Sequence, residues 1–157
     1  MLNILAHSGV KDGADYLAST GEVSVSWLGI FLAVVAAMAI GTLWYGPIFG
    51  KKWTKLVKLN TKTAGSPLVP MLIMTTLAII QAFVLAHFIV YVGYFYPDYS
   101  QLSVGLLTGA WAFAGFVAPV LISNTVFAKG SVELLKISLG NQLITLLAIG
   151  AILGSVN

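Results

Sequence analysis

The sequence contains no cysteine and no arginine, and it has few charged residues of any kind. The absence of cysteine excludes disulfides, iron–sulfur clusters, covalently attached haem and thiol nucleophiles. Only 8% of the 157 residues are charged, whereas a soluble domain carries about 25%. Because 59% of the residues are hydrophobic, the chain cannot cover its whole surface with groups that water solvates. We therefore expect an integral membrane protein with one membrane domain.

Four long apolar segments account for most of the chain. Each approaches or exceeds the roughly 20 residues that a helix needs to cross about 30 Å of hydrocarbon. Lipid offers no partners to backbone polar groups, so all four segments are predicted to be α-helices. The predicted fold class is all-α, an integral membrane four-helix bundle with helices at about 27–45, 68–95, 102–127 and 132–156. Residues 1–26 are predicted to form a polar N-terminal tail and not a cleavable signal peptide, and residues 27–157 the transmembrane domain.

The ends of these helices carry their own signals. Gly46 and Pro47 predict the end of the first helix, because proline cannot donate a backbone hydrogen bond and disfavours helix before it. Ser66 and Pro67 are typical of a helix start, with serine as the N-cap. Glu133 falls in the first turn of the fourth helix, where the helix dipole favours an acidic residue.

Lysines are distributed unequally among the connections between the apolar segments. Five lie between the first and second segments, and Lys129 and Lys136 flank the junction of the third and fourth. The opposite side carries Asp98 and a tail in which acids outnumber lysine. Because cytoplasmic loops are enriched in lysine, we expect both lysine-bearing connections to be cytoplasmic and both termini to be non-cytoplasmic.

The lysine-rich connection also has a helical pattern. Phe49, Trp53 and Leu56 recur at helical spacing, and lysines recur on the opposite face. This pattern predicts an amphipathic helix in the membrane interface, with its lysines near anionic headgroups. The helix either only anchors the chain and sets its topology, or it also binds a specific lipid or an acidic partner. The predicted interface residues are Trp44, Tyr45, Lys51, Lys52, Trp53, Lys55, Lys58 and Lys62.

Two motifs carry a resemblance to a known family. They are residues 41–53 (GTLWYGPIFGKKW) and residues 111–119 (WAFAGFVAP), the latter followed by Asn124 and Phe127. In combination they resemble domain-of-unknown-function family 1761, and the likeness covers about residue 27 to the C-terminus. The resemblance implies a bacterial four-helix membrane protein, and it brings no assigned activity and no catalytic residues.

His87 is the one ionisable side chain deep within the apolar segments. With Tyr91, Tyr94 and Asp98 it forms a stripe at i, i+4, i+7 and i+11, which runs toward the outer surface. An ionisable group within the membrane predicts a functional role, here a path for protons or a small solute. The structural alternative is a neutral histidine that is hydrogen-bonded to a neighbouring helix, with tyrosines in the interfacial belt.

Further polar side chains lie within the second, third and fourth helices. Gln81 and Asn141 lie at similar depths from the cytoplasmic ends, so we expect that they can meet. Such groups either hold helices together through hydrogen bonds or line a hydrated cavity. The complete set of intramembrane polar candidates is Gln81, His87, Asn124, Asn141, Gln142 and Thr145.

The third helix contains Pro119, four residues after Gly115. Proline removes one helical hydrogen bond and frees the carbonyl of Gly115, which predicts a kink. Broken helices with nearby polar residues mark binding sites in transporters, but a kink can also only shape the packing. The small residues Gly105 and Gly109, and Gly150 and Gly154, predict close helix contacts within one chain or between copies.

The sequence has no nucleophile–base pair and no glycine-rich phosphate loop, so we expect no enzymatic activity. His7 and His87 are too few and too far apart for a metal site within one chain. No cofactor is predicted, although His87 could ligate a pigment or haem. The expected partners are membrane lipids and either further copies of the chain or a larger membrane complex, with no nucleic acid.

Two functional hypotheses follow for a multi-pass protein of the bacterial inner membrane. In the first, the protein is an oligomeric or accessory scaffold that binds lipid or partner subunits. In the second, it is a small channel or transporter for an ion or neutral solute, with a polar path near the broken third helix.

Overall fold

A computed structural model describes residues 25–58 and 66–156 of the chain. The described residues are helical throughout apart from short connections, in agreement with the predicted all-α class. Four helical spans are long and apolar enough to cross a membrane: Trp27–Ile48, Leu68–Phe95, Gln101–Phe127 and Val132–Val156. The protein is therefore a multi-pass membrane protein. Nearly all of the predicted tail, and Lys62, lie outside the described residues.

Two of the four spans contain a π-helical turn, one at the end of the span and one within it. The first consists of α2 (Trp27–Leu43) and the π-turn η1 (Trp44–Ile48), and the short helix α3 (Gly50–Leu56) follows it. The second span is α4 (Leu68–Phe95). The third consists of α5 (Gln101–Ala112), the π-turn η2 (Phe113–Val117) and α6 (Ala118–Phe127), and the fourth is α7 (Val132–Val156).

The predicted stop at Gly46 and Pro47 is wrong. The α-helix ends earlier, at Leu43, but the chain stays helical through Ile48. The wider π-turn accommodates Pro47, and the backbone N–H of Phe49 donates to the carbonyl of Trp44 at 2.9 Å. This bond spans five residues instead of four, as expected for a π-turn. The helix therefore continues past Pro47 instead of ending there.

The other helix ends follow familiar capping chemistry. Ser26 accepts a hydrogen bond from the backbone N–H of Gly29 at 3.1 Å, and Ser100 caps α5 in the same way through Ser103. At α4 the prediction is shifted by one residue, since the N-cap position is Pro67 and the hydroxyl of Ser66 accepts from the N–H of Leu68. Each bond satisfies a backbone donor that the first turn leaves free.

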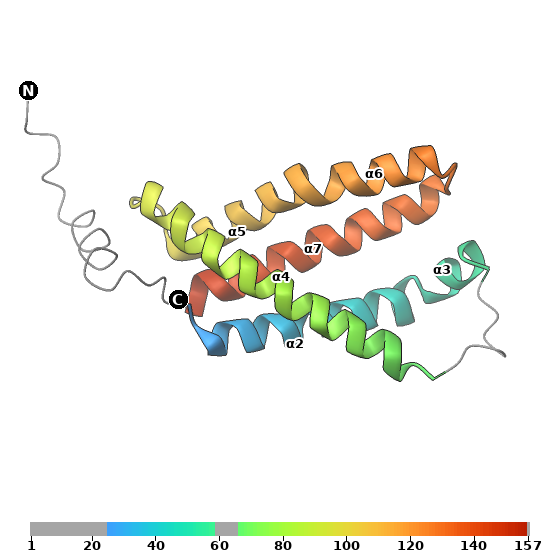
Figure 1. Ribbon diagram of the computed structural model, residues 1–157, viewed down its shortest axis with the longest axis horizontal. Coiled ribbons are helices and arrows are strands. Elements are labelled where there is room, and N and C mark those ends of the chain that lie inside the picture. Colours follow the sequence, from blue (N-terminus) through green and yellow to red (C-terminus); the bar gives the residue numbers. More distant parts are fainter. Residues whose placement is uncertain (1–24, 59–65, 157) are drawn as a thin grey trace, which may run out of the picture.

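α7 is the central helix of the bundle. It packs against α5 along one side and against α2 along another, and it also contacts α4 and α6. Figure 1 shows α5 and α6 running alongside α7, whereas α4 crosses the bundle diagonally. The core consists of small and branched apolar residues, among them Ala33, Ala82, Ile89, Ile149 and Leu153. Most remaining apolar side chains of α4 face outward, with Leu72 68% exposed, which suits contact with lipid.

Glycines allow α5 and α7 to approach until their backbones touch. A Cβ atom on Gly105 would collide with the carbonyl oxygen of Gly150, and one on Gly150 would collide with that of Gly105. A Cβ on Gly109 would lie 2.6 Å from the carbonyl oxygen of Leu146, and a Cβ on Gly154 would collide with the carbonyl oxygen of Gln101 on α5. We call this contact the glycine seam. The predicted small-residue faces therefore meet within one chain.

The third span is packed against the bundle before η2 and has no buried residue in the helix after it. Pro119 lies in the first turn of α6, where its missing N–H leaves no further bond unmade. Gly115 lies inside η2, and a Cβ there would meet no atom within 4 Å. Beyond this point α6 has no buried residue. The predicted break is therefore a π-turn, and it separates a packed half of the span from a peripheral half.

Candidate pocket and basic end

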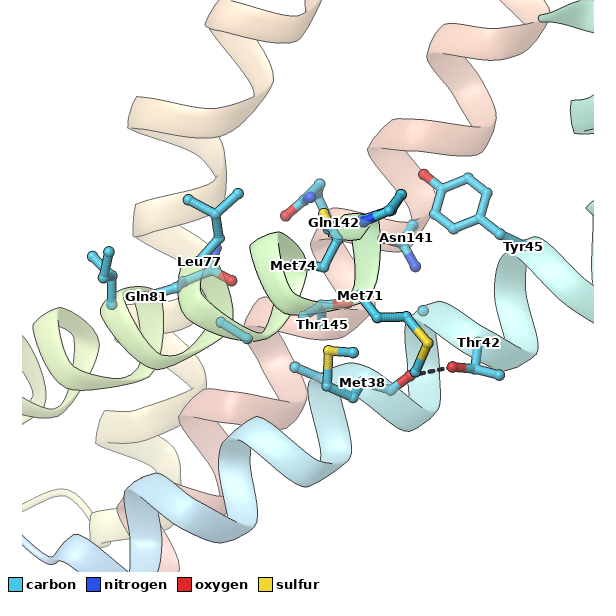
Figure 2. Close-up of a pocket in the computed structure, with 15 residues that line it drawn as sticks. Met38, Thr42, Tyr45, Met71, Met74, Leu77, Gln81, Asn141, Gln142 and Thr145 are labelled. Carbon is cyan, nitrogen blue, oxygen red and sulfur yellow. Dashed lines mark hydrogen bonds between the residues drawn. The ribbon is translucent and has the colours of Figure 1, made fainter. Parts of the chain in front are cut away.

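A pocket of about 520 Å³ lies between α2, α4 and α7. Figure 2 shows its residues, which come from all three helices and, in the case of Tyr45, from η1. Polar groups include Thr42, Tyr45, Gln81, Asn141, Gln142 and Thr145, and the apolar lining includes Met38, Met71, Met74 and Leu77. No charged residue lines it among those described. The volume lies within the range of roughly 300–1,000 Å³ that is typical of small-molecule sites.

The structure brings the predicted pair Gln81 and Asn141 into this one pocket, together with Gln142 and Thr145. Gln81 lies near the middle of the 28-residue helix α4. Asn141 lies nine residues after the start of α7, which is about 14 Å at 1.5 Å per residue. Both side chains are therefore at the depth of the hydrocarbon core.

Asn141 is the unusual member of the set. It is only 6% exposed, and in the described part of the chain its Nδ2 is a buried side-chain donor without a hydrogen-bond partner. In the view of Figure 2 the amide nitrogen points from α7 toward α2. A buried, unpaired amide donor costs roughly 1–3 kcal/mol of stability. A bound molecule that supplies a hydrogen-bond acceptor to Asn141 would remove this cost.

His87 and Asn124 are not part of this pocket. The Nδ1–H of His87 donates to the carbonyl oxygen of Phe83 in its own helix at 2.8 Å, and its ring packs against Phe83 with centroids 4.4 Å apart. α4 ends at Phe95, so Asp98 does not continue the predicted stripe. Asn124 is exposed on α6. The polar candidates thus separate into a pocket group and two isolated residues.

The aromatic motif at 41–53 forms a tight corner rather than a simple belt. The indole N–H of Trp44 donates to the carbonyl oxygen of Ile137 on α7 at 3.0 Å, and its ring lies over Gly140. Tyr45 packs edge-on against Trp53, with ring centroids 5.6 Å apart. A Cβ on Gly50 would lie 2.7 Å from the carbonyl oxygen of Tyr45. The motif therefore fixes the end of the first span onto α7.

α3 and the α6–α7 turn lie at the same end of the bundle (Figure 1), and the described segments at this end carry six exposed lysines. Lys52 forms an ion pair of 3.4 Å with Glu133, which joins α3 to the first turn of α7. α3 ends at Leu56, and Lys58 follows it with a left-handed φ of 54°, so the predicted helical spacing does not continue as far as Lys58. We call this region the basic end, and its exposed lysines are Lys51, Lys52, Lys55, Lys58, Lys129 and Lys136.

Sequence reasoning missed the methionines and Thr42 as pocket residues. In the sequence, nothing distinguishes Met38, Met71 and Met74 from the other apolar residues of the same helices. The spacing of Met71 and Met74 by one helical turn was the available signal, but only the crossing of α4 over α2 places both beside Met38. Thr75 lies at this crossing, where its hydroxyl donates to the carbonyl oxygen of Met71 at 2.9 Å and lies 3.6 Å from the sulfur of Met38.

These features define a class, namely a small polytopic membrane-helix bundle with an intramembrane pocket. The family described as "Protein of unknown function (DUF1761)" matches residues 28–154. The chain belongs to this family, which confirms the resemblance carried by the two sequence motifs. No curated protein and no solved structure matches the chain.

Proposed function

We propose that the protein is a membrane scaffold or accessory subunit that binds anionic lipid at its basic end. The observation that best supports this proposal is that six exposed lysines and only one acid among the described residues, Glu133, lie at this end. Each lysine near an anionic membrane surface contributes about 1 kcal/mol of attraction. The corner formed by Trp44 and Trp53 holds α3 beside α7, so the lysines of both elements act on the same membrane surface.

Lipid retention tests this proposal directly. The triple variant Lys51→Gln, Lys55→Gln, Lys58→Gln is compared with wild type in nanodiscs that contain phosphatidylglycerol and phosphatidylcholine. Native mass spectrometry then counts the anionic lipids that stay bound. The arginine triple variant at the same positions is the matched control because it keeps the charge. We expect the glutamine variant to lose most of its preference for phosphatidylglycerol; equal retention in all three proteins contradicts lipid binding at the basic end.

The partner of such a scaffold is either a second copy of the chain or a larger membrane complex. The peripheral helix α6 supports an association, because it buries no residue in the chain and begins beside the exposed residues Ala114 and Gly115. The glycine seam is already occupied within the chain and gives no such support. Gly115→Trp should reduce co-isolated copies or partners in native mass spectrometry; unchanged assembly argues against this face.

The proposal includes a location and an orientation. We place the protein in the bacterial inner membrane with the basic end in the cytoplasm, on the basis of the lysine asymmetry. In this proposal it acts without catalysis, and nucleic acid is not a partner. Since the chain has no cysteine, single Lys129→Cys and Ser100→Cys variants test the orientation. A membrane-impermeant thiol reagent added to intact spheroplasts should label the second and not the first.

A second candidate function is a channel or transporter for an ion or neutral solute, and the pocket is the observation that favours it. The pocket contains Gln81, Asn141 and Thr145 at hydrocarbon depth. A complete path would have to continue past His87 to the opposite end. Glycerol flux into liposomes should then depend on both Asn141 and His87. Flux that survives Asn141→Leu and His87→Phe, or an absence of flux in wild type, excludes this function.

A further inference from the structure

We propose that the pocket between α2, α4 and α7 binds an isoprenoid quinone, with the Asn141 amide donating a hydrogen bond to a ring carbonyl oxygen. The inference is independent of lipid binding at the basic end, because it concerns other residues at a different depth. Four observations carry it: the unpaired donor, the absence of charge, the depth and the lateral opening.

The unpaired Nδ2 of Asn141 specifies an acceptor on the ligand. This atom has no partner among the described residues although the side chain is more than nine-tenths buried. An occupant that supplies an oxygen acceptor would remove the cost of this buried donor. Gln142 and Thr145 line the same region and offer further hydrogen-bonding groups to a second oxygen.

The lining excludes a charged ligand. No lysine, aspartate, glutamate or histidine is among the residues that line the pocket in the described part of the chain. A charged ligand at this depth would be left without an opposite charge in a medium of low dielectric, which costs several kcal/mol. A neutral molecule with carbonyl groups meets both requirements.

The depth distinguishes a quinone from a phospholipid. Asn141 lies five residues beyond Lys136, the last charged residue of α7, which is about 8 Å at 1.5 Å per residue, and it therefore lies inside the hydrocarbon core, which is about 30 Å thick. The ester carbonyls of phospholipids lie in the interfacial region outside this core. A quinone is neutral and carries its carbonyl oxygens on an apolar ring, so it brings an acceptor to the depth of Asn141.

The shape of the site fits a molecule that enters from the lipid. On α4 the rim is formed by Met71, Met74, Leu77 and Ile80, each more than half exposed. Flexible methionine side chains adapt to ligands of irregular shape, and an isoprenoid tail can leave the pocket between them into the bilayer. The volume of about 520 Å³ accommodates a substituted ring together with the first part of its tail.

The test uses the full chain in phosphatidylcholine nanodiscs and ubiquinone-2 as the probe, with binding followed by tryptophan fluorescence quenching and native mass spectrometry. Asn141→Leu removes the donor while conserving the approximate size. Gly41→Leu fills the pocket, since Gly41 lines it and a Cβ there meets no atom within 4 Å. The matched controls are Asn124→Leu and Gly115→Leu, which change the same residue types outside the pocket.

We expect one quinone per chain, with affinity at least tenfold lower in Asn141→Leu and in Gly41→Leu and unchanged in both controls. Squalene, an isoprenoid without carbonyl groups, should not compete. Equal quinone binding in all variants would mean simple partition into the nanodisc and would overturn the proposal. Equal competition by squalene, or recovery of phospholipid alone from the pocket, would overturn it as well. Circular dichroism of each variant ensures that lost binding is not lost folding.

Discussion

The two ends of α7 are packed in opposite ways. Its C-terminal half contributes Gly150 and Gly154 to the glycine seam, where backbones touch and side chains are absent. Its N-terminal half contributes Asn141 and Gln142 to a pocket of about 520 Å³. The comparison teaches that one helix can combine a closely packed anchor with a site that stays open. The seam holds α5 and α7 together, so α4 and α2 can remain apart around the pocket without loss of the bundle.

Packing and polarity change together along the helix. The seam is built on glycines, which have no polar side chain that needs a hydrogen-bond partner. Its contacts are van der Waals contacts between backbones. The pocket consists of long, flexible or polar side chains, one of which is unsatisfied. Stability and ligand binding are therefore assigned to different parts of α7, and mutations in the two parts should have effects of opposite sign.

The largest effect is expected at the seam. Gly105→Leu places a side chain against the backbone of Gly150, so α5 and α7 must separate. Overpacking of this kind should lower the free energy of unfolding by about 3 kcal/mol. Gly46→Leu, at a position where a Cβ meets no atom within 4 Å, is the control. Thermal unfolding in detergent, followed by circular dichroism, measures both; similar midpoints would mean that the seam is not the anchor.

The pocket should respond in the opposite direction. Asn141→Leu removes the unpaired buried amide, so without ligand the variant should be more stable than wild type by about 1 kcal/mol. The same unfolding measurement applies, with Asn124→Leu on the exposed surface of α6 as the control. A destabilised Asn141→Leu protein would show that the amide has an acceptor in the membrane and that the site is not vacant.

A smaller loss is expected where η1 is attached to α7. Trp44→Phe keeps an aromatic ring over Gly140 but removes the hydrogen bond to the carbonyl of Ile137. Such bonds are worth about 0.6 kcal/mol on average in membrane bundles. Trp27→Phe, at a side chain that is 72% exposed, serves as the control in the same unfolding assay. No difference between the two variants would assign Trp44 to the interfacial belt alone.

The smallest effect is expected at the basic end. The ion pair between Lys52 and Glu133 joins two exposed side chains, and exposed pairs contribute less than about 1 kcal/mol. A double-mutant cycle with Lys52→Gln and Glu133→Gln should give a coupling energy below about 0.5 kcal/mol that decreases further in salt. A larger coupling would mean that α3 is held by charge as well as by its aromatic corner.

Much of the architecture could be read from local signals. The second and fourth spans have the predicted bounds, and the third begins one residue earlier than predicted, because hydrophobic length and turn residues determine where a membrane helix begins and ends. The π-turns could not be predicted, since Pro47 and Pro119 are compatible with a stop, a kink or a wider turn. Which of these forms depends on the partners that the freed backbone groups find in the folded bundle.

Hydropathy and charge alone predict four segments that are long and apolar enough to cross a membrane, because so few charged residues make the surface of these segments compatible with lipid and not with water. The sequence also placed Gln81 and Asn141 at similar depths. The helix packing was needed to see that the glycine faces meet within one chain, that Trp44 docks on α7, and that His87 and Asn124 lie outside the pocket. Helix length and depth are properties of single segments, whereas helix rotation and crossing angle depend on how neighbouring side chains fit together.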